Sequence, residues 1–138
     1  MKTRPPWFYK QAAVIPYRRI GVELEILLTT SKGGHWIIPK GIIDPGETAI
    51  ESACKEAYEE AGIEGRADPR IIGEYQYNKW GGICVVQVFA MEVTKVLDSW
   101  PEAYVRERKW LGKDAAVKAV GKSHLKELIR NFSPGNGD

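Results

Sequence analysis

Three glutamates in this chain are spaced so that one helix would gather their carboxylates. The stretch from Thr48 to Ala61 has the residue pattern of a helix, and at 100° per residue Glu56, Glu59 and Glu60 fall together on one side. Like charges at i, i+3 and i+4 weaken an isolated helix, so stability alone does not account for them. Converging carboxylates suit Mg²⁺, which takes oxygen ligands and keeps several waters.

The alternative is a solvated acidic helix face, the usual meaning of a charge run. The flanking sequence favours the metal site. Two loop segments rich in Gly and Pro, Pro39–Gly41 and Asp44–Glu47, precede the helix. Gly62 stands where a glycine commonly ends a helix.

The segment 41–63 resembles the Nudix box. That motif has a glycine, five residues, a glutamate, seven residues, Arg-Glu, an aliphatic residue, any residue, Glu-Glu, any residue, a glycine and an aliphatic residue. The matching positions here are Gly41, Glu47, Glu56, Ala57, Glu59, Glu60, Gly62 and Ile63. One position departs from the motif, because Lys55 stands where the family has arginine.

The resemblance implies hydrolysis of a phosphoanhydride with Mg²⁺, or Mn²⁺ as an alternative. By position, Glu56 and Glu60 would be metal ligands. Glu59 would be a ligand or the base that takes a proton from water, with Glu102 and Glu107 as other candidate bases. Repulsion between the carboxylates should raise their pKa values in the metal-free protein.

The residues around these glutamates would support the same site. The resemblance implies that the carbonyl of Lys40 adds a metal contact and that Glu47 faces the box arginine. Lys55 could supply the positive charge of that arginine, but not its planar two-pronged geometry. Its effect on the rigidity of the site is therefore open.

Length and composition indicate an ordinary globular protein. The 138 residues suit one domain, 1–138, and 43% of them are hydrophobic and 28% charged. The net charge of +2 does not by itself argue for a stable nucleic-acid partner. Cys54 and Cys84 both fall in apolar segments and are expected to be core residues without a disulfide. No apolar run reaches membrane-spanning length and the N-terminus lacks an apolar signal core, so no membrane association and a cytoplasmic location are expected.

Hydrophobic periodicity predicts the order of the elements. Strands are expected over 11–17 (ended or bulged at Pro16), 22–30, 36–38, 71–79, 83–93 and 105–111. Helices are expected over 48–61, 113–120 and 124–132, the last with Ser123 as its N-cap. A loose N-terminus over 1–8, turns at 18–21 and 80–82, a connector at 65–68 and a tail over 133–138 complete the chain. This order predicts an α+β fold, a mixed β-sheet in an αβα sandwich. The resemblance implies the Nudix fold, which is such a sandwich with the box helix packed on the sheet.

Two motifs outside the box resemble one branch of the family. Trp36 to Gly41 matches the W-x-x-P-K-G lead-in of diadenosine polyphosphate and diphosphoinositol polyphosphate hydrolases. Leu97 to Leu111 resembles a region of the second group in which Trp-Pro-Glu and Arg-x-Arg-x-Trp recur. The resemblance implies a small phosphorylated substrate of one of these classes. Oxidised nucleoside triphosphates, messenger-RNA caps and RNA 5′-pyrophosphates stay open, because their hydrolysis needs the same metal site.

Basic and aromatic residues supply candidates for substrate binding. Arginine and lysine are the usual partners of phosphate oxygens. The candidates are Lys40, Arg18, Arg19, Lys32, Arg106 and Arg108, the last two on one face of the strand expected over 105–111. For each, the alternative is a solvated surface charge. Tyr17, Tyr75, Tyr77 and Trp80 could stack on a nucleobase or pack in the protein. Neither His35 nor His124 has metal-ligand spacing, and His35, in the loop before the box, is the better candidate for substrate contact.

Three classes of function are compatible with the sequence. The first is a Nudix phosphoanhydride hydrolase, a monomer or homodimer. The second is a Nudix-fold binding module that has lost turnover, for which Lys55 is the one supporting feature. The third is a helix-rich interaction domain with an accidental box. The intact Glu56, Glu59 and Glu60 favour the hydrolase.

Overall fold

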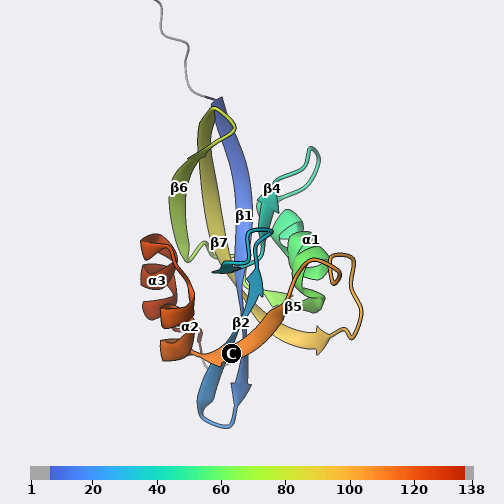
Figure 1. The fold of residues 1–138 in the computed structure, drawn as a ribbon, viewed down its shortest axis with the longest axis vertical. Helices are drawn as coiled ribbons and strands as arrows, with labels where there is room; N and C mark the ends of the chain where they lie inside the picture. The colour runs from blue at the N-terminus through green and yellow to red at the C-terminus, as the bar shows by residue number, and fades with distance from the viewer. Residues whose placement is uncertain (1–6, 136–138) are drawn as a thin grey trace, which may run out of the picture.

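A computed structural model describes residues 7–135 (Figure 1). The strands are β1 (Trp7–Ile20), β2 (Glu23–Thr30), β3 (Trp36–Ile37), β4 (Lys40–Ile42), β5 (Ile63–Ala67), β6 (Gly73–Lys79), β7 (Gly82–Val96) and β8 (Arg108–Gly112). The helices are α1 (Ala49–Ala61), α2 (Lys113–Ala119) and α3 (Ser123–Arg130). Within the described residues, no helix has the length and apolar character needed to span a membrane.

The strands form one mixed sheet of eight strands. Its central order is β3-β2-β1-β7-β5, with β4 paired to β1, β6 to β7 and β8 to β2. The two long strands β1 and β7 run parallel, and the other pairs are antiparallel. The predicted mixed sheet is therefore confirmed.

Helices cover both faces of this sheet. Figure 1 shows α1 on one side and α2 with α3 on the other. Successive strand residues point to opposite faces, so neighbours in one strand enter different cores. Ala12 and Val14 of β1 pack in the core under α1, whereas Ala13 and Ile15 pack in the core under α2 and α3. The αβα sandwich predicted from the sequence is confirmed.

Helix α1 begins and ends as its sequence predicts. The Thr48 side chain accepts a hydrogen bond from the Glu51 N–H, and the Glu51 carboxylate accepts one from the Thr48 N–H, which completes a capping box. Gly62 ends the helix in the left-handed region, at φ 65°. A side chain there would meet Trp100 and Arg108, so glycine serves both the turn and the packing.

Four predicted boundaries around the sheet are wrong. The prediction of a loose N-terminus over 1–8 fails at residues 7 and 8, which begin β1, while 1–6 lie outside the described residues. Strand β1 does not end at Pro16 but continues through the predicted turn at 18–21 to Ile20. The segment predicted as a connector at 65–68 belongs mostly to β5, which pairs with the end of β7.

Pro16 is tolerated within β1 because of where its nitrogen points. The Val14 N–H donates to the Pro39 carbonyl, on the side of β1 where β4 and β2 pair. Alternate backbone nitrogens point to the same side, so the Pro16 nitrogen also faces that side. Pairing with β4 stops at Ala13 and pairing with β2 starts at Tyr17, so the missing N–H falls in a gap of the ladder.

The last third of the chain also differs from the prediction. Residues 101–105 form turns, and β8 starts only at Arg108, so Arg106 lies in the preceding loop and not on a strand face. The N-cap of α3 is Lys122, with no side-chain cap, and Ser123 is the first helical residue. Both cysteines are free: Cys84 is fully buried, whereas Cys54 is only half-buried beside the core under α1.

Candidate active site

The carboxyl groups of Glu56 and Glu60 meet where α1 lies against β4. Gly41 of β4 makes this possible, because a Cβ there would lie 2.3 Å from Cδ and 2.4 Å from Cγ of Glu56. The two carboxyls interact directly, and the interaction raises the pKa of Glu60. One turn of helix separates them, so they lie on the same face. The space left by Gly41 and the helical spacing in α1 thus bring two of the three predicted acidic groups together.

The carboxyl group of Glu60 is almost fully buried, with 5% of the residue exposed. The Lys40 N–H donates to its Oε1 at 3.4 Å, and Nη2 of Arg106 lies 3.8 Å from its Oε2. Burial raises the pKa of Glu60 to about 8, against the opposing effect of Arg106. Burial also raises the pKa of Glu56, and the charge of Glu59 adds to the rise. The direction expected from crowded carboxylates is therefore found at Glu56 and Glu60.

A cation fits this pair of carboxyls. Burial disfavours the charged form of both carboxyls, and a hard cation bound between them would offset that cost and favour the charged form. The Arg106 guanidinium offsets only part of the negative charge of Glu60, because it is shared: its Nε also donates to Glu102 Oε1 at 2.8 Å. The site therefore offers oxygen ligands together with uncompensated negative charge, the combination that Mg²⁺ prefers.

The predicted set of three converging carboxylates is not assembled. Among residues 7–135, no group of three acidic, histidine or cysteine side chains is placed to hold a metal. Glu59 precedes Glu60 in α1 and is half-buried. Its backbone carbonyl accepts a hydrogen bond from the Glu102 N–H at 3.0 Å. Glu102 is close enough to affect the pKa of both Glu56 and Glu60, whereas Glu107 is exposed. Of the two loop candidates for the base, Glu102 is thus the one beside the pair.

Lys55 lies in a network of hydrogen bonds and ion pairs with the loop that precedes α1. Its Nζ lies 3.1 Å from both carboxylate oxygens of Glu47 and also contacts Asp44. Ser52 donates from Oγ to Glu47 at 2.7 Å and accepts from the Asp44 N–H at 3.2 Å. The acidic partners raise the pKa of Lys55, which keeps it charged. The contact of the box cation with Glu47 that the resemblance implied is present, and Asp44 adds a second carboxylate.

A cavity of about 690 Å³ opens beside β4, with Glu60 in its lining. The cationic residues that line it are Lys32, Lys40, Lys79, Arg106 and Lys122. Aromatic residues also line it, namely Trp36, Tyr77 and Trp80, together with His35. Glu60 is the only carboxylate among the described residues of this lining. The cavity therefore joins a buried acidic group to a strongly basic wall.

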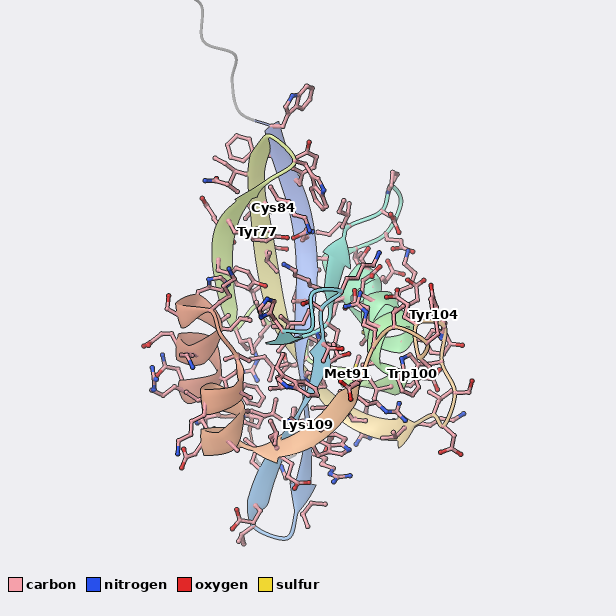
Figure 2. All side chains as sticks on the ribbon, in the orientation of Figure 1. Tyr77, Cys84, Met91, Trp100, Tyr104 and Lys109 are labelled. Carbon is pink, nitrogen blue, oxygen red and sulfur yellow. The ribbon has the colours of Figure 1, made fainter. Side chains whose placement is uncertain are left out.

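Lys40 connects these two parts. Its backbone N–H faces Glu60, while its Nζ lies over the Tyr77 ring, 4.0 Å from the centroid. Burial, together with repulsion from Lys79, lowers the pKa of Lys40 to about 8. Figure 2 labels Tyr77 on β6 and Cys84 on β7, which lie opposite each other in the antiparallel pair.

The structure separates the six predicted substrate-binding residues. Lys40, Lys32 and Arg106 line the cavity. Arg18 instead pairs with Glu25 and lies over Trp110, and Arg19 donates to backbone carbonyls of the C-terminal segment. Arg108 donates to the carbonyls of Ala61 and Gly62 at the end of α1, with its guanidinium over the Trp100 ring. In this structure these three arginines are engaged in contacts within the fold, outside the cavity.

Two cavity cations escaped the sequence reasoning. Lys79 ends β6, and Lys122 lies between α2 and α3, far from the box in sequence. Only the packing of these elements brings them to Lys40, and no local motif signals it. Among the aromatic candidates, Tyr77 and Trp80 line the cavity, whereas Tyr17 contacts Phe132, and Tyr75 stacks on His124. The predicted position of His35 at the site agrees with the lining.

Comparisons with known proteins agree with this architecture. A family model described as the NUDIX domain matches residues 9–132. Nudix hydrolase 13, mitochondrial, of Arabidopsis thaliana is 32% identical over 141 residues, which cover 86% of this chain and 70% of that protein. Diphosphoinositol polyphosphate phosphohydrolase 3-alpha of Mus musculus is 30% identical over 143 residues, covering 97% of this chain and 86% of that protein.

A solved structure is similar over most of the chain. The Ap4A hydrolase of C. elegans superposes with a TM-score of 0.74 at 25% identity, covering 90% of this chain and 95% of that one. The range that the family model matches, 9–132, contains the box, the carboxyl pair and the cavity described above. The chain belongs to the Nudix hydrolase family.

Proposed function

We propose that the protein hydrolyses a phosphoanhydride bond with Mg²⁺ in a nucleoside polyphosphate or a diphosphoinositol polyphosphate. The observation that carries this proposal is the cavity in which the buried carboxyl of Glu60, with Glu56 beside it, adjoins a basic wall. Relatives named as a diphosphoinositol polyphosphate phosphohydrolase and an Ap4A hydrolase support both substrate classes.

In this mechanism Glu56 and Glu60 would hold the cation, and the Lys40 carbonyl is a further candidate ligand. When bound, Mg²⁺ would neutralise phosphate charge and lower the pKa of a water molecule. Arg106 keeps Glu60 in position through its 3.8 Å contact and is itself held by the Thr30 carbonyl at 2.8 Å. Its side chain is 9% exposed, so this support is rigid.

A base must take a proton from the attacking water. We assign this role to Glu59, because it stands on the same helix turn and is half-buried rather than enclosed. Glu102 is the competing candidate, although its carboxylate already accepts the Arg106 guanidinium at 2.8 Å. One oxygen of Glu102 is therefore already used by Arg106, which leaves Glu59 as the preferred base.

The cationic wall binds the phosphate groups of the substrate. Lys32 and Lys40 lie in the lining, and their ammonium groups can donate to phosphate oxygens from two sides. The Lys55 network holds the loop before α1 through Glu47 and Asp44, so the lysine at the box arginine position is compatible with an ordered site.

A phosphate-release panel at fixed Mg²⁺ tests the proposal. It compares diadenosine polyphosphates, diphosphoinositol polyphosphates, nucleoside triphosphates and 5′-triphosphate RNA, with Glu59→Gln and Glu102→Gln alongside. All products are separated by chromatography as well, because cleavage of a diadenosine polyphosphate gives two nucleotides and no free phosphate. The proposal expects turnover of one of the first two classes and a loss of at least a hundredfold in Glu59→Gln. A binding module would show no turnover of any substrate although Mg²⁺ still binds.

A further inference from the structure

The cavity has a second charged region on the side of Lys40 that faces away from Glu60. We propose that Lys40, Lys79 and Lys122 form an anion subsite for phosphate groups that are not hydrolysed. The inference rests on the proposed function, because it extends the same cavity. It assigns the substrate as a small molecule that carries phosphates beyond its anhydride, rather than one whose far end is a nucleobase.

Three elements supply the three ammonium groups. Lys40 comes from β4, Lys79 from the end of β6, and Lys122 from the segment between α2 and α3. They are close enough that Lys79 and Lys122 both act on the charge of Lys40. None of the three forms an ion pair with a carboxylate within residues 7–135. Glu60 is the only carboxylate among the described residues of this lining, so the lysines outnumber it. Like charges repel, and an anion would offset that repulsion.

The aromatic residues beside these lysines serve as supports for them. Nζ of Lys40 lies 4.0 Å from the centroid of the Tyr77 ring, and Nζ of Lys79 lies 4.7 Å from that of Trp80. An ammonium on a ring face is attracted to it and keeps its remaining N–H groups free to donate. The faces that would stack on a nucleobase are thus already occupied on one side by cations.

Tyr77 is itself fixed in place, which orients the support. Its hydroxyl donates to Oε1 of Gln11 at 2.6 Å, and Gln11 lies on β1 at the centre of the sheet. Its ring is half-buried against the core under α2 and α3. Lys40 is therefore held at a defined position, with its main chain at the carboxyl pair and its side chain at the lysine cluster.

Space for further phosphates is present next to the cluster. A second cavity of about 310 Å³ shares Lys40, Tyr77 and Lys122 with the first, and Asn78 and His124 add polar groups to its wall. The two cavities adjoin along Lys40, so a ligand could reach from Glu60 past the lysines. A ring bearing several phosphates fits this arrangement, in which the acidic residue Glu60 is followed along the cavities by several lysines.

Binding of inositol hexakisphosphate without metal tests the subsite apart from hydrolysis, because this compound has no anhydride bond. Fluorescence of Trp36 and Trp80, which line the cavity, reports occupancy. We expect Lys79→Gln and Lys122→Gln each to raise the Kd about tenfold, as for loss of one charge-assisted hydrogen bond. Lys118→Gln is the matched control, since Lys118 is exposed on α2 outside both cavities.

The outcomes separate this inference from the proposed function. Glu59→Gln should keep the wild-type Kd, because it alters hydrolysis and not the lysines. Lysine-dependent binding without turnover of any substrate would support the subsite and overturn the hydrolase. Turnover combined with a Kd that is equal in Lys79→Gln, Lys122→Gln and Lys118→Gln would overturn the subsite alone. No binding by the wild-type protein at millimolar ligand, or displacement of the ligand by adenosine, would also overturn it.

Discussion

Gly41→Ala should disable the active site while leaving the fold intact. Gly41 lies in β4, paired with Ala12 of β1, and the helix α1 places Glu56 directly over it. A methyl group at this position would lie 2.3 Å from Cδ of Glu56, where ordinary contact begins near 3.4 Å. The carboxylate must therefore move by about 1.1 Å, and the end of a side chain can do so more easily than the backbone.

The expected magnitude follows from this displacement. A shift of about 1 Å in a reacting or coordinating group costs on the order of a hundredfold in rate. We expect kcat/KM to fall about a hundredfold and Mg²⁺ affinity to fall about tenfold or more, as for loss of a group that orients a ligand. The free energy of unfolding should fall by only about 1 kcal/mol, because no backbone atom has to move.

Steady-state product formation and a thermal melt with and without Mg²⁺ measure both effects. Gly112→Ala is the control, since a Cβ there meets nothing within 4 Å and its φ is −60°. This control loses only N-cap preference at α2. Equal kcat/KM and equal Mg²⁺ stabilisation in the two variants would refute the role assigned to Gly41.

Three further predictions concern the supports of the site. Asp44→Asn should lower turnover about tenfold in the protein with Lys55. The loss should be smaller in a Lys55→Arg background, because a guanidinium can bind both carboxylate oxygens of Glu47. Equal losses in the two backgrounds of this double-mutant cycle would contradict the role of Asp44 as a partner of Lys55. The pKa of Glu60 is about 8 in the folded metal-free protein, above its ordinary 4.5, so its contribution to stability is complete below about pH 4.5 and is lost as the pH rises through 8. Denaturant melts of the metal-free protein should show a loss of roughly 1 kcal/mol per pH unit across that window, and an unchanged slope in Glu60→Gln would count against it. Arg108→Met should lower the free energy of unfolding by about 2 kcal/mol, since carbonyls at the end of α1 lose their donor, and a raised KM at unchanged stability would instead indicate substrate contact.

The sequence predicts α1 well because its signals are local. Thr48 and Glu51 cap one end and Gly62 the other, so the bounds follow from residues within one turn of each end. The pairing of Lys55 with Glu47 spans only eight positions and was also expected. The carboxylate of Glu59 was expected to join those of Glu56 and Glu60, but among the described residues the three do not form a metal-binding group. Residues at i, i+3 and i+4 lie on the same helix face, which does not bring all three carboxylates to one position.

Features that depend on tertiary packing were missed or misplaced. Pro16 indicated a strand end, yet the change of neighbour from β4 to β2 removes the need for its N–H. Lys79 and Lys122 carry no local motif, and only the meeting of β6 with the α2–α3 segment brings them to Lys40. Arg108 has the residue type of a phosphate ligand, but its donors are used by carbonyls of the fold.

The account depends most directly on a divalent cation at Glu56 and Glu60. Titration of Mg²⁺ into the metal-free protein by calorimetry, at pH 7 in two buffers of different ionisation enthalpy, measures the affinity and the protons released. We predict one site, with close to one proton released because burial keeps a proton on the pair, and loss of both signals in Glu56→Gln and Glu60→Gln. Binding of unchanged affinity in these variants, or binding without proton release, would contradict the central claim.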